Sequence, residues 1–182
     1  TKAKKLKVAL NQNAWDGRWF KRAFADNGDV YGSMENDECK IDSIAQSWSI
    51  ISGAGEEPKQ NQAIESLESH LIDKESGIIK LLDPPFEKSK LEPGYIKSYL
   101  PGVRENGGQY THAAVWAIIA ETFLGRGDTA VELYRMITPI EHARTKETAN
   151  KYKVEPYVIA ADVYGAKNLA GSGGWTWYTG SS

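Results

Sequence analysis

Hydrophobic residues recur at helical spacing along most of this chain. The spacing predicts helices, each with one apolar face, over residues 44–51, 58–71, 109–124 and 128–137. Signals for the helix ends agree with these bounds. Asp42 or Ser43 is placed to cap the first helix, and Pro58 falls in the first turn of the second. Gly125 ends the third helix, and Asp128 is expected to cap the fourth.

The remaining segments carry weaker or shorter patterns. Residues 6–10 alternate between apolar and polar and predict a strand, as does the short run 77–82. The sequence Asp-Asn-Gly at 26–28 predicts a β-hairpin near the N-terminus. Four of the seven prolines lie in 83–102, where we expect an extended, ordered loop. A last helix is predicted for 157–164, directly after a proline.

The order of these elements favours a mainly α fold. Helices alternate with short and long loops, and no repeat of fixed period is present. Such an order fits antiparallel helix pairs in an α/α toroid better than a βαβ sheet, with function carried by the longer loops. The last residues, 179–182, look like the start of a helix with nothing after it. We therefore expect residues 1–182 to be one domain that is part of a larger unit.

Composition narrows the class of protein. The chain has 182 residues, is 41% hydrophobic and 25% charged, and has a formal net charge of -2. These values describe an ordinary globular domain and give no indication of nucleic-acid binding. No apolar stretch approaches the length of a membrane span. Cys39 is the only cysteine, which fits a reducing compartment, and we expect a cytoplasmic protein. Six Trp and nine Tyr against four Phe suit stacking on sugar rings, although aromatic cores are the commoner explanation.

One loop concentrates the polar chemistry of the chain. Between Gly102 and Trp116 it carries an acid, a base, amides and a histidine, namely Arg104, Glu105, Asn106, Gln109, Tyr110, Thr111 and His112. Glycines surround the cluster and an apolar helix follows it, an arrangement typical of active-site loops on a rigid scaffold. The residues alone leave open a surface loop that merely caps a core helix, with His112 as a structural histidine.

Five stretches in this order carry a resemblance to a known family. They are N-A-W-D-G-R-W-F (13–20), D-S-I-A-Q-S-W (42–48), P-G-V-R-E-N-G-G-Q-Y-T-H-A-A (101–114), Y-K-V-E-P-Y-V-I-A-A-D-V-Y (152–164) and G-G-W-T-W-Y-T-G-S (173–181). Together they resemble glycoside hydrolase family 94, which contains cellobiose, chitobiose and β-1,2-oligoglucan phosphorylases and the C-terminal domain of cyclic β-1,2-glucan synthases. The resemblance implies a six-hairpin α/α barrel, of which this chain would be the C-terminal portion.

The resemblance also implies an activity and a set of site residues. The activity is inverting phosphorolysis, in which a β-glucoside and phosphate give α-glucose 1-phosphate, with inorganic phosphate as co-substrate and no cofactor or metal. Phosphate binding would fall to His112, Thr179 and Gly180, and sugar binding to Glu105 and Arg104. An imidazole and a helix start can both bind an oxyanion, and a carboxylate forms strong hydrogen bonds with hydroxyls.

A second group of residues has looser assignments. Trp15 and Asp16 are expected to contact sugar on the acceptor side. Trp48, Trp116 and Cys39 are assigned to packing.

Two departures from the family pattern shape the expectations. The family's general acid is an aspartate in an Asp-Trp-Asn-Asp-like motif, which does not occur here, so no catalytic residue is assigned and the isolated chain is expected to be inactive. Ala161 stands where cellobiose- and chitobiose-type members carry a sugar-binding glutamine, which favours the β-1,2-glucan branch.

The expected partners are a β-glucan oligosaccharide, phosphate and the remainder of the chain's own catalytic domain. Half a barrel should leave an apolar helix face bare, so we also expect a homo-oligomer. The face concerned is that of Ala113, Ala117, Ala120 and Leu124. The alternatives are a domain of a cyclic β-1,2-glucan synthase, a non-catalytic carbohydrate-binding module and a helical interaction scaffold.

Overall fold

The computed structural model describes residues 1–176 as a mainly helical chain with short paired strands. The helices are α1 (Lys2–Asn13), α2 (Ser43–Ile51), α3 (Glu57–Leu71), α4 (Thr111–Phe123), α5 (Gly127–Ile137), α6 (Pro139–His142) and α7 (Lys146–Tyr152), with a 3-10 helix η1 (Gly94–Ser98). The antiparallel strand pairs are β1 (Ala23–Phe24) with β2 (Val30–Tyr31), β3 (Ile41–Asp42) with β6 (Leu82–Asp83), β4 (Ile72–Asp73) with β5 (Ile78–Ile79), and β7 (Gln109–Tyr110) with β8 (Asp162–Val163). The predicted mainly α fold is confirmed.

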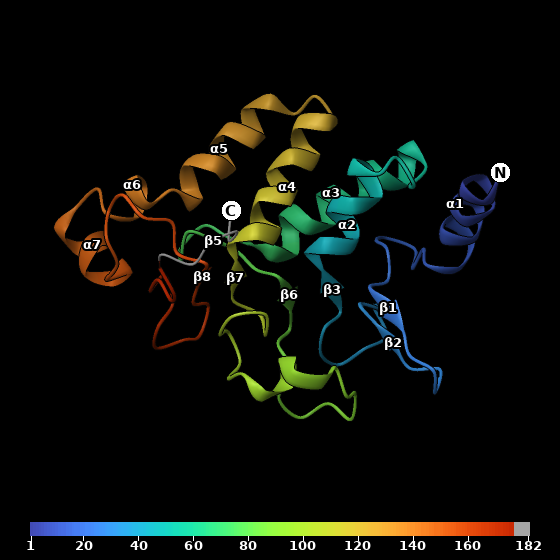
Figure 1. The fold of residues 1–182 in the computed structure, drawn as a ribbon, viewed down its shortest axis with the longest axis horizontal. Coiled ribbons are helices and arrows are strands. Elements are labelled where there is room, and N and C mark those ends of the chain that lie inside the picture. The colour runs from blue at the N-terminus through green and yellow to red at the C-terminus, as the bar shows by residue number, and fades with distance from the viewer. Residues whose placement is uncertain (177–182) are drawn as a thin grey trace.

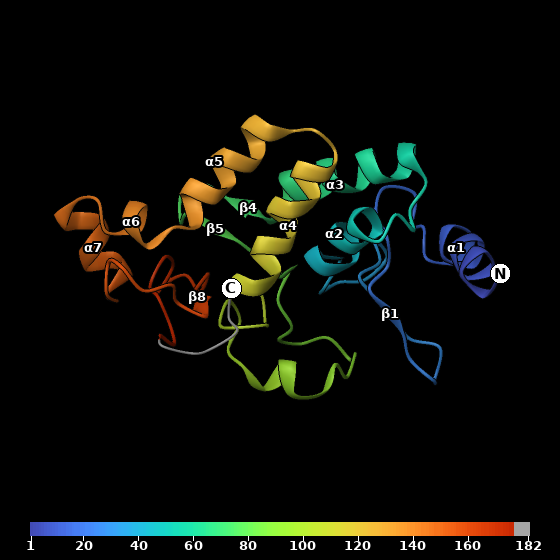
Figure 2. The same ribbon diagram turned by 45° about the horizontal axis from the view of Figure 1, so that its top comes forward.

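Helices α2 to α5 lie side by side and form the core of the molecule (Figures 1 and 2). Helix α2 packs against α3 and α4, and α4 packs against α5. The buried core residues include Ile64, Leu67, Leu71, Ala114, Ala117, Ala120, Leu133 and Ile137. The small alanines of α4 let neighbouring helices approach closely, while leucine and isoleucine supply most of the buried apolar area. This side-by-side packing is that of part of an α/α barrel.

The expectation of a bare apolar face on α4 was wrong. Ala113, Ala117 and Ala120 are at most 1% exposed, and Leu124 is half-buried against the core. Helix α4 packs against both α2 and α5, so this face is not bare. The large apolar side chains that remain exposed point elsewhere on the helical layer, among them Phe123 and Tyr134.

The predicted helix starts are confirmed at α2 and α3 and shifted at α5. The carboxylate of Asp42 accepts hydrogen bonds from the backbone N–H groups of Ile44 and Ala45, and Pro58 lies in the first turn of α3. Helix α5 begins one residue earlier than expected, so that Asp128 lies inside its first turn instead of capping it. An acidic residue in a first turn still interacts favourably with the helix dipole.

Two element predictions were wrong. Residues 6–10 belong to helix α1, whose only buried side chain is Asn11. Residues 157–164 form no helix, and their end is strand β8, paired with β7. The short helices α6 and α7 were not predicted. None of the helices within residues 1–176 is long and apolar enough to cross a membrane.

The hairpin and the long loop are as predicted. Strands β1 and β2 enclose the Asp-Asn-Gly turn, and residues 83–102 are ordered by polar contacts. The carboxylate of Glu38 accepts hydrogen bonds from three successive backbone N–H groups of this loop, at 87–89. The ammonium group of Lys97 donates to the carbonyls of Ser89 and Leu91. In Figure 1 the loop lies below the helical layer, on the side from which β3 and β7 lead into α2 and α4.

Candidate functional site

Two buried amides hold the loop that precedes α4. The side chain of Asn106 donates to the carbonyls of Phe86 and Tyr99 and accepts from the N–H of Phe86. Gln109 accepts from the N–H of Ile79 and donates to the hydroxyl of Thr111. Because both amides are fully buried and occupied, they serve as scaffold. The loop is therefore a rigid platform for the side chains between them.

Close backbone packing fixes the start of this loop. Gly102 has a φ of +83°, and a Cβ on it would collide with the backbone of Ala166. Its carbonyl accepts hydrogen bonds from the N–H groups of Gly165 and Ala166. A glycine is required here because no other residue combines this φ with this approach. The residues after β8 are thereby held against the loop.

Arg104 lies between aromatic rings. Its guanidinium carbon is 4.3 Å from the ring centroid of Trp175 and 5.5 Å from that of Tyr99. The residue has a φ of +51°, an uncommon conformation for a side chain other than glycine. Its buried Nε has no hydrogen-bond partner in the part of the chain that the structure describes. Stacking orients the guanidinium while leaving donor capacity unused.

Glu105, the next residue, also has unused capacity. Its Oε2 is buried and accepts no hydrogen bond from any residue within 1–176. Tyr95 lies close by: burial raises the pKa of its hydroxyl, and the charge of the Glu105 carboxylate and a hydrogen bond to that carboxylate add to the rise. A buried carboxylate oxygen without a donor costs free energy, on the order of 1–3 kcal/mol. A ligand hydroxyl would remove that cost.

Asp162 from strand β8 is the third charged residue at this place. It is 0% exposed, its Oδ1 accepts from the N–H of Trp175 at 3.1 Å, and its Oδ2 has no partner among the described residues. Burial raises its pKa, Glu105 adds to the rise, and the Trp175 hydrogen bond and the charge of Arg104 oppose it. Asp162 is therefore within electrostatic reach of both loop residues. We call Arg104, Glu105 and Asp162 the loop cluster.

The loop cluster suits a polyhydroxylated ligand. It combines a guanidinium donor, a carboxylate acceptor and the aromatic rings of Tyr95, Tyr99 and Trp175. Sugars present hydroxyls that both donate and accept, together with C–H faces that pack on aromatic rings. Within residues 1–176 no group of His, Cys, Asp and Glu is placed to hold a metal ion.

His112 stands at the start of α4, on the same loop-to-helix connection. Its ring is half-exposed and lies 4.5 Å, centroid to centroid, from that of Trp116. Trp116 in turn meets Trp48 edge to face at 5.4 Å. Trp48 is 42% exposed, so it packs on Trp116 without being a core residue. No hydrogen bond joins either ring nitrogen of His112 to another residue within 1–176. Both nitrogens are therefore available to a ligand.

The other predicted site residues lie elsewhere or outside the described chain. Asp16 forms an ion pair with Lys21 at 3.4 Å and accepts from the N–H of Met34 at 2.6 Å. The ring of Trp15 packs edge to face on that of Phe20. Within residues 1–176, no hydrogen bond, ion pair or ring contact joins them to the loop cluster. Thr179 and Gly180 lie outside the described residues.

Sequence reasoning missed Asp162, Trp175 and the tyrosines at 95 and 99 as site residues. Asp162 and Trp175 stood inside motifs that were quoted for the family resemblance, without roles of their own. The prolines around Tyr95 and Tyr99 predicted only an ordered loop. Ala161, read as a substrate determinant, is buried, and its N–H donates to the carbonyl of Trp175 at 2.7 Å.

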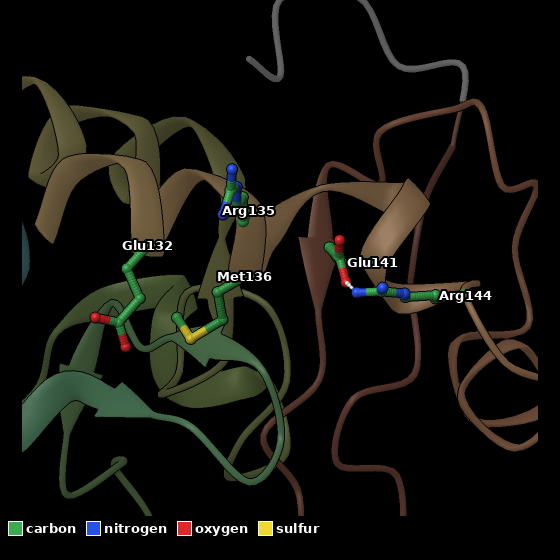
Figure 3. A pocket seen from close by; sticks show the side chains of 5 residues that line it. All are labelled: Glu132, Arg135, Met136, Glu141 and Arg144. Atoms are coloured by element: carbon green, nitrogen blue, oxygen red, sulfur yellow. Dashed lines mark hydrogen bonds and ion pairs between the residues drawn. The ribbon is translucent and has the colours of Figure 1, made fainter. Parts of the chain in front are cut away.

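A shallow cavity of about 560 Å³ lies beside α5 and α6, away from these residues. It is lined by Glu132, Arg135, Met136, Glu141 and Arg144. Figure 3 shows Glu141 paired with Arg144 while Arg135 points away from Glu132 and Met136. Its charged side chains do not converge, and no predicted site residue borders it. We therefore place the candidate site at the loop cluster.

Comparison with known proteins identifies the family to which this chain is similar. A family model described as "Glycosyl hydrolase 94 superfamily, catalytic domain" matches residues 1–182. The cyclic beta-(1,2)-glucan synthase NdvB of Rhizobium meliloti (strain 1021) is 51% identical over 97% of this chain and 6% of its own length. The solabiose phosphorylase of Paenibacillus borealis is 31% identical over 99% of the chain and 23% of its own length. The N,N'-diacetylchitobiose phosphorylase of Vibrio proteolyticus is 28% identical over 97% of the chain and 23% of its own length. The chain thus spans less than a quarter of these relatives.

Proposed function

The chain belongs to the glycosyl hydrolase 94 superfamily, and we propose that residues 1–182 are the C-terminal portion of a catalytic domain that phosphorolyses β-1,2-glucans. In this reaction a phosphate oxygen attacks the anomeric carbon from the face opposite the leaving group. The C–O bond to the shortened glucan breaks, a general acid protonates the leaving oxygen, and α-glucose 1-phosphate is released. The acid is supplied by residues outside this chain.

The unpartnered buried atoms of the loop cluster carry the proposal. Glu105 accepts hydrogen bonds from hydroxyls of the glucosyl unit, and Arg104 donates to the same sugar. His112, at the start of α4, binds phosphate together with Thr179 and Gly180, where a hydroxyl and backbone N–H groups supply further donors. Phosphate is the co-substrate, and no cofactor is needed.

Substrate choice and partners are the finer parts of the proposal. The preference for β-1,2 linkages rests on Ala161, which offers no amide to a sugar, and on the 51% identity with the synthase NdvB. Trp15 and Asp16 contact sugar on the acceptor side. The remainder of the catalytic domain is the partner of this chain, and we expect the intact protein to lie in the cytoplasm.

A second candidate is a domain of a cyclic β-1,2-glucan synthase. It is favoured by the same 51% identity over 97% of the chain. In that case the domain would act on the same linkage within a larger enzyme, so the loop cluster would bind the same sugar. Release of glucose 1-phosphate by the purified full-length protein separates a phosphorylase from a synthase that makes cyclic product.

The test is phosphorolysis by the full-length protein that carries this chain. We expect glucose 1-phosphate from β-1,2-glucooligosaccharides to form faster than from cellobiose. His112→Ala should raise the KM for phosphate by about tenfold or more, because a hydrogen bond to a charged group contributes about 1.5–3 kcal/mol. Faster turnover of cellobiose would refute the linkage preference. An unchanged phosphate KM in His112→Ala would refute its role, and no phosphorolysis of either sugar would refute the activity.

A further inference from the structure

Asp162 is more enclosed than a residue that touches sugar would be. It is 0% exposed, and a Cβ added to Gly174 would lie 2.5 Å from both carboxylate oxygens. The main chain of Gly174 thus covers the carboxylate, and its N–H donates to the Asp162 carbonyl at 2.8 Å. Arg104 and Glu105 are partly exposed, so we take them as the residues that a ligand meets and Asp162 as one that it does not.

A short series of contacts leads from Asp162 to Arg104. The carboxylate of Asp162 accepts from the N–H of Trp175, and the Trp175 ring stacks on the Arg104 guanidinium at 4.3 Å. The Asp162 charge also acts on Arg104 through space, although no ion pair within 4.0 Å joins the two in the described chain. Both routes fix where the guanidinium lies. Strand pairing of Asp162 with Tyr110 anchors the aspartate itself beside the start of α4.

We propose that Asp162 is a positioning residue for the donor sugar site: it holds the Gly174–Trp175 segment and thereby sets the Arg104 guanidinium against Trp175. The inference rests on the proposed function and adds a residue to it. The unpartnered Oδ2 of Asp162 belongs to the negative charge that keeps Arg104 turned into the site. The effect on substrate is indirect, since Arg104 makes the contact.

The first test is Asp162→Asn in the full-length protein. Asparagine keeps an oxygen for the Trp175 N–H and removes the charge. We expect the KM for a β-1,2-glucooligosaccharide to rise about tenfold while the KM for phosphate stays within about twofold, because the charged hydrogen bond from Arg104 to the sugar loses its orientation and the phosphate-binding residues are unchanged. Adding Asp162→Asn to Arg104→Ala should change the glucan KM by less than about twofold, since the residue then has nothing to position.

Asp42→Asn is the matched control. Asp42 is also buried, at 3% exposed, accepts from a backbone N–H, and lies 3.4 Å from an arginine, Arg22. This variant should lower the thermal midpoint without changing the glucan KM. Equal KM values for wild type and Asp162→Asn would overturn the inference, as would additive effects of Asp162→Asn and Arg104→Ala.

Direct binding separates a failure of this inference from a failure of the proposed function. If the wild-type protein does not phosphorolyse glucan, the proposed function falls, and calorimetric titration with β-1,2-glucooligosaccharide decides the role of Asp162. Weaker binding by Asp162→Asn than by wild type and Asp42→Asn supports positioning. Equal binding by all three proteins, or no binding by any, overturns it.

Discussion

Within residues 1–176, two places can be compared in which one arginine lies near several glutamate or aspartate side chains. The loop cluster is Arg104, Glu105 and Asp162. The second place, which we call the helix cluster, is Arg126, Glu68 and Glu121, between α3 and the end of α4. Each holds a carboxylate residue that is 0% exposed, Asp162 and Glu121 respectively. By composition and burial the two clusters are nearly the same.

The arginines differ in what they contact. Arg126 donates to Glu68 at 2.9 Å, to Asn61 at 3.2 Å and to Glu65 at 3.3 Å, so its guanidinium is held by side chains of α3. Arg104 stacks on two rings and has a buried Nε without a partner in the described residues. An arginine whose guanidinium is held by carboxylates and an amide of a neighbouring helix joins elements of the fold, whereas one that is stacked without hydrogen-bond partners has donors for a ligand. Both Glu121 oxygens also lack a donor among the described residues, so the two clusters differ at the arginine and not at the carboxylates.

The largest effect is expected for Arg104→Ala. It should lower kcat/KM for glucan phosphorolysis by about 100-fold, because at least one charged hydrogen bond to sugar is lost with its orientation. The thermal midpoint of the full-length protein should change little, since only ring stacking, about 0.5–2 kcal/mol, is removed. Steady-state kinetics and thermal unfolding measure the two effects. Severe destabilisation with normal kinetics of the folded fraction would make Arg104 a structural residue like Arg126.

Arg126→Ala should do the opposite. Its loss leaves Glu68 beside Glu121 without a compensating charge, and we expect a destabilisation of about 2 kcal/mol with kcat/KM within about twofold. Arg144→Ala is the control, because its ion pair with Glu141 is exposed and contributes at most about 0.5 kcal/mol. Chemical denaturation monitored by tryptophan fluorescence compares the three proteins. Equal stability of Arg126→Ala and Arg144→Ala would contradict a structural role for the helix cluster.

The sequence predicted the helical layer well because its signals are local. Helices α2, α3 and α4 follow from apolar spacing, a capping aspartate and a first-turn proline, all within one turn or two of the chain. The strand prediction for residues 6–10 was wrong because α1 buries only the polar Asn11. The spacing of its apolar residues therefore does not reflect packing against a core. The helix prediction for residues 157–164 was wrong because their backbone hydrogen-bond partners are distant in the sequence. The carbonyl of Ala161 accepts from the N–H of Thr111, and its N–H donates to the carbonyl of Trp175.

The same distinction applies to the site. Arg104 and Glu105 were found because glycines and neighbouring polar residues mark their loop. Asp162 was not, since its role depends on Trp175, 13 residues on, and on Arg104, which lies far back in the sequence. Local patterns do not report contacts that only the fold creates. For the helix cluster, likewise, no pattern in α4 sets Glu121 apart from an exposed glutamate.

A pH dependence of stability is expected from the helix cluster. Burial raises the pKa of Glu121 to about 8, and the neighbouring Glu68 carboxylate adds to the rise, while Arg126 opposes it. The folded state therefore keeps a proton that the unfolded chain, with the ordinary pKa of 4.5, has released. The contribution of Glu121 to stability is greatest below that lower value and falls as pH rises towards 8, by at most about 1.4 kcal/mol per pH unit. Glu121→Gln, which cannot ionise and can still donate to Glu68, should flatten this fall and be more stable than wild type at pH 8, by up to about 4 kcal/mol, the fall accumulated between the two pKa values. Thermal midpoints at pH 5.5, 7 and 8 measure the slope, with Glu141→Gln at an exposed ion pair as the control that keeps the wild-type slope. A Glu121→Gln protein with the wild-type slope would show that Glu121 is ionised in the fold, and the contrast between a proton-holding helix cluster and a ligand-binding loop cluster would be lost.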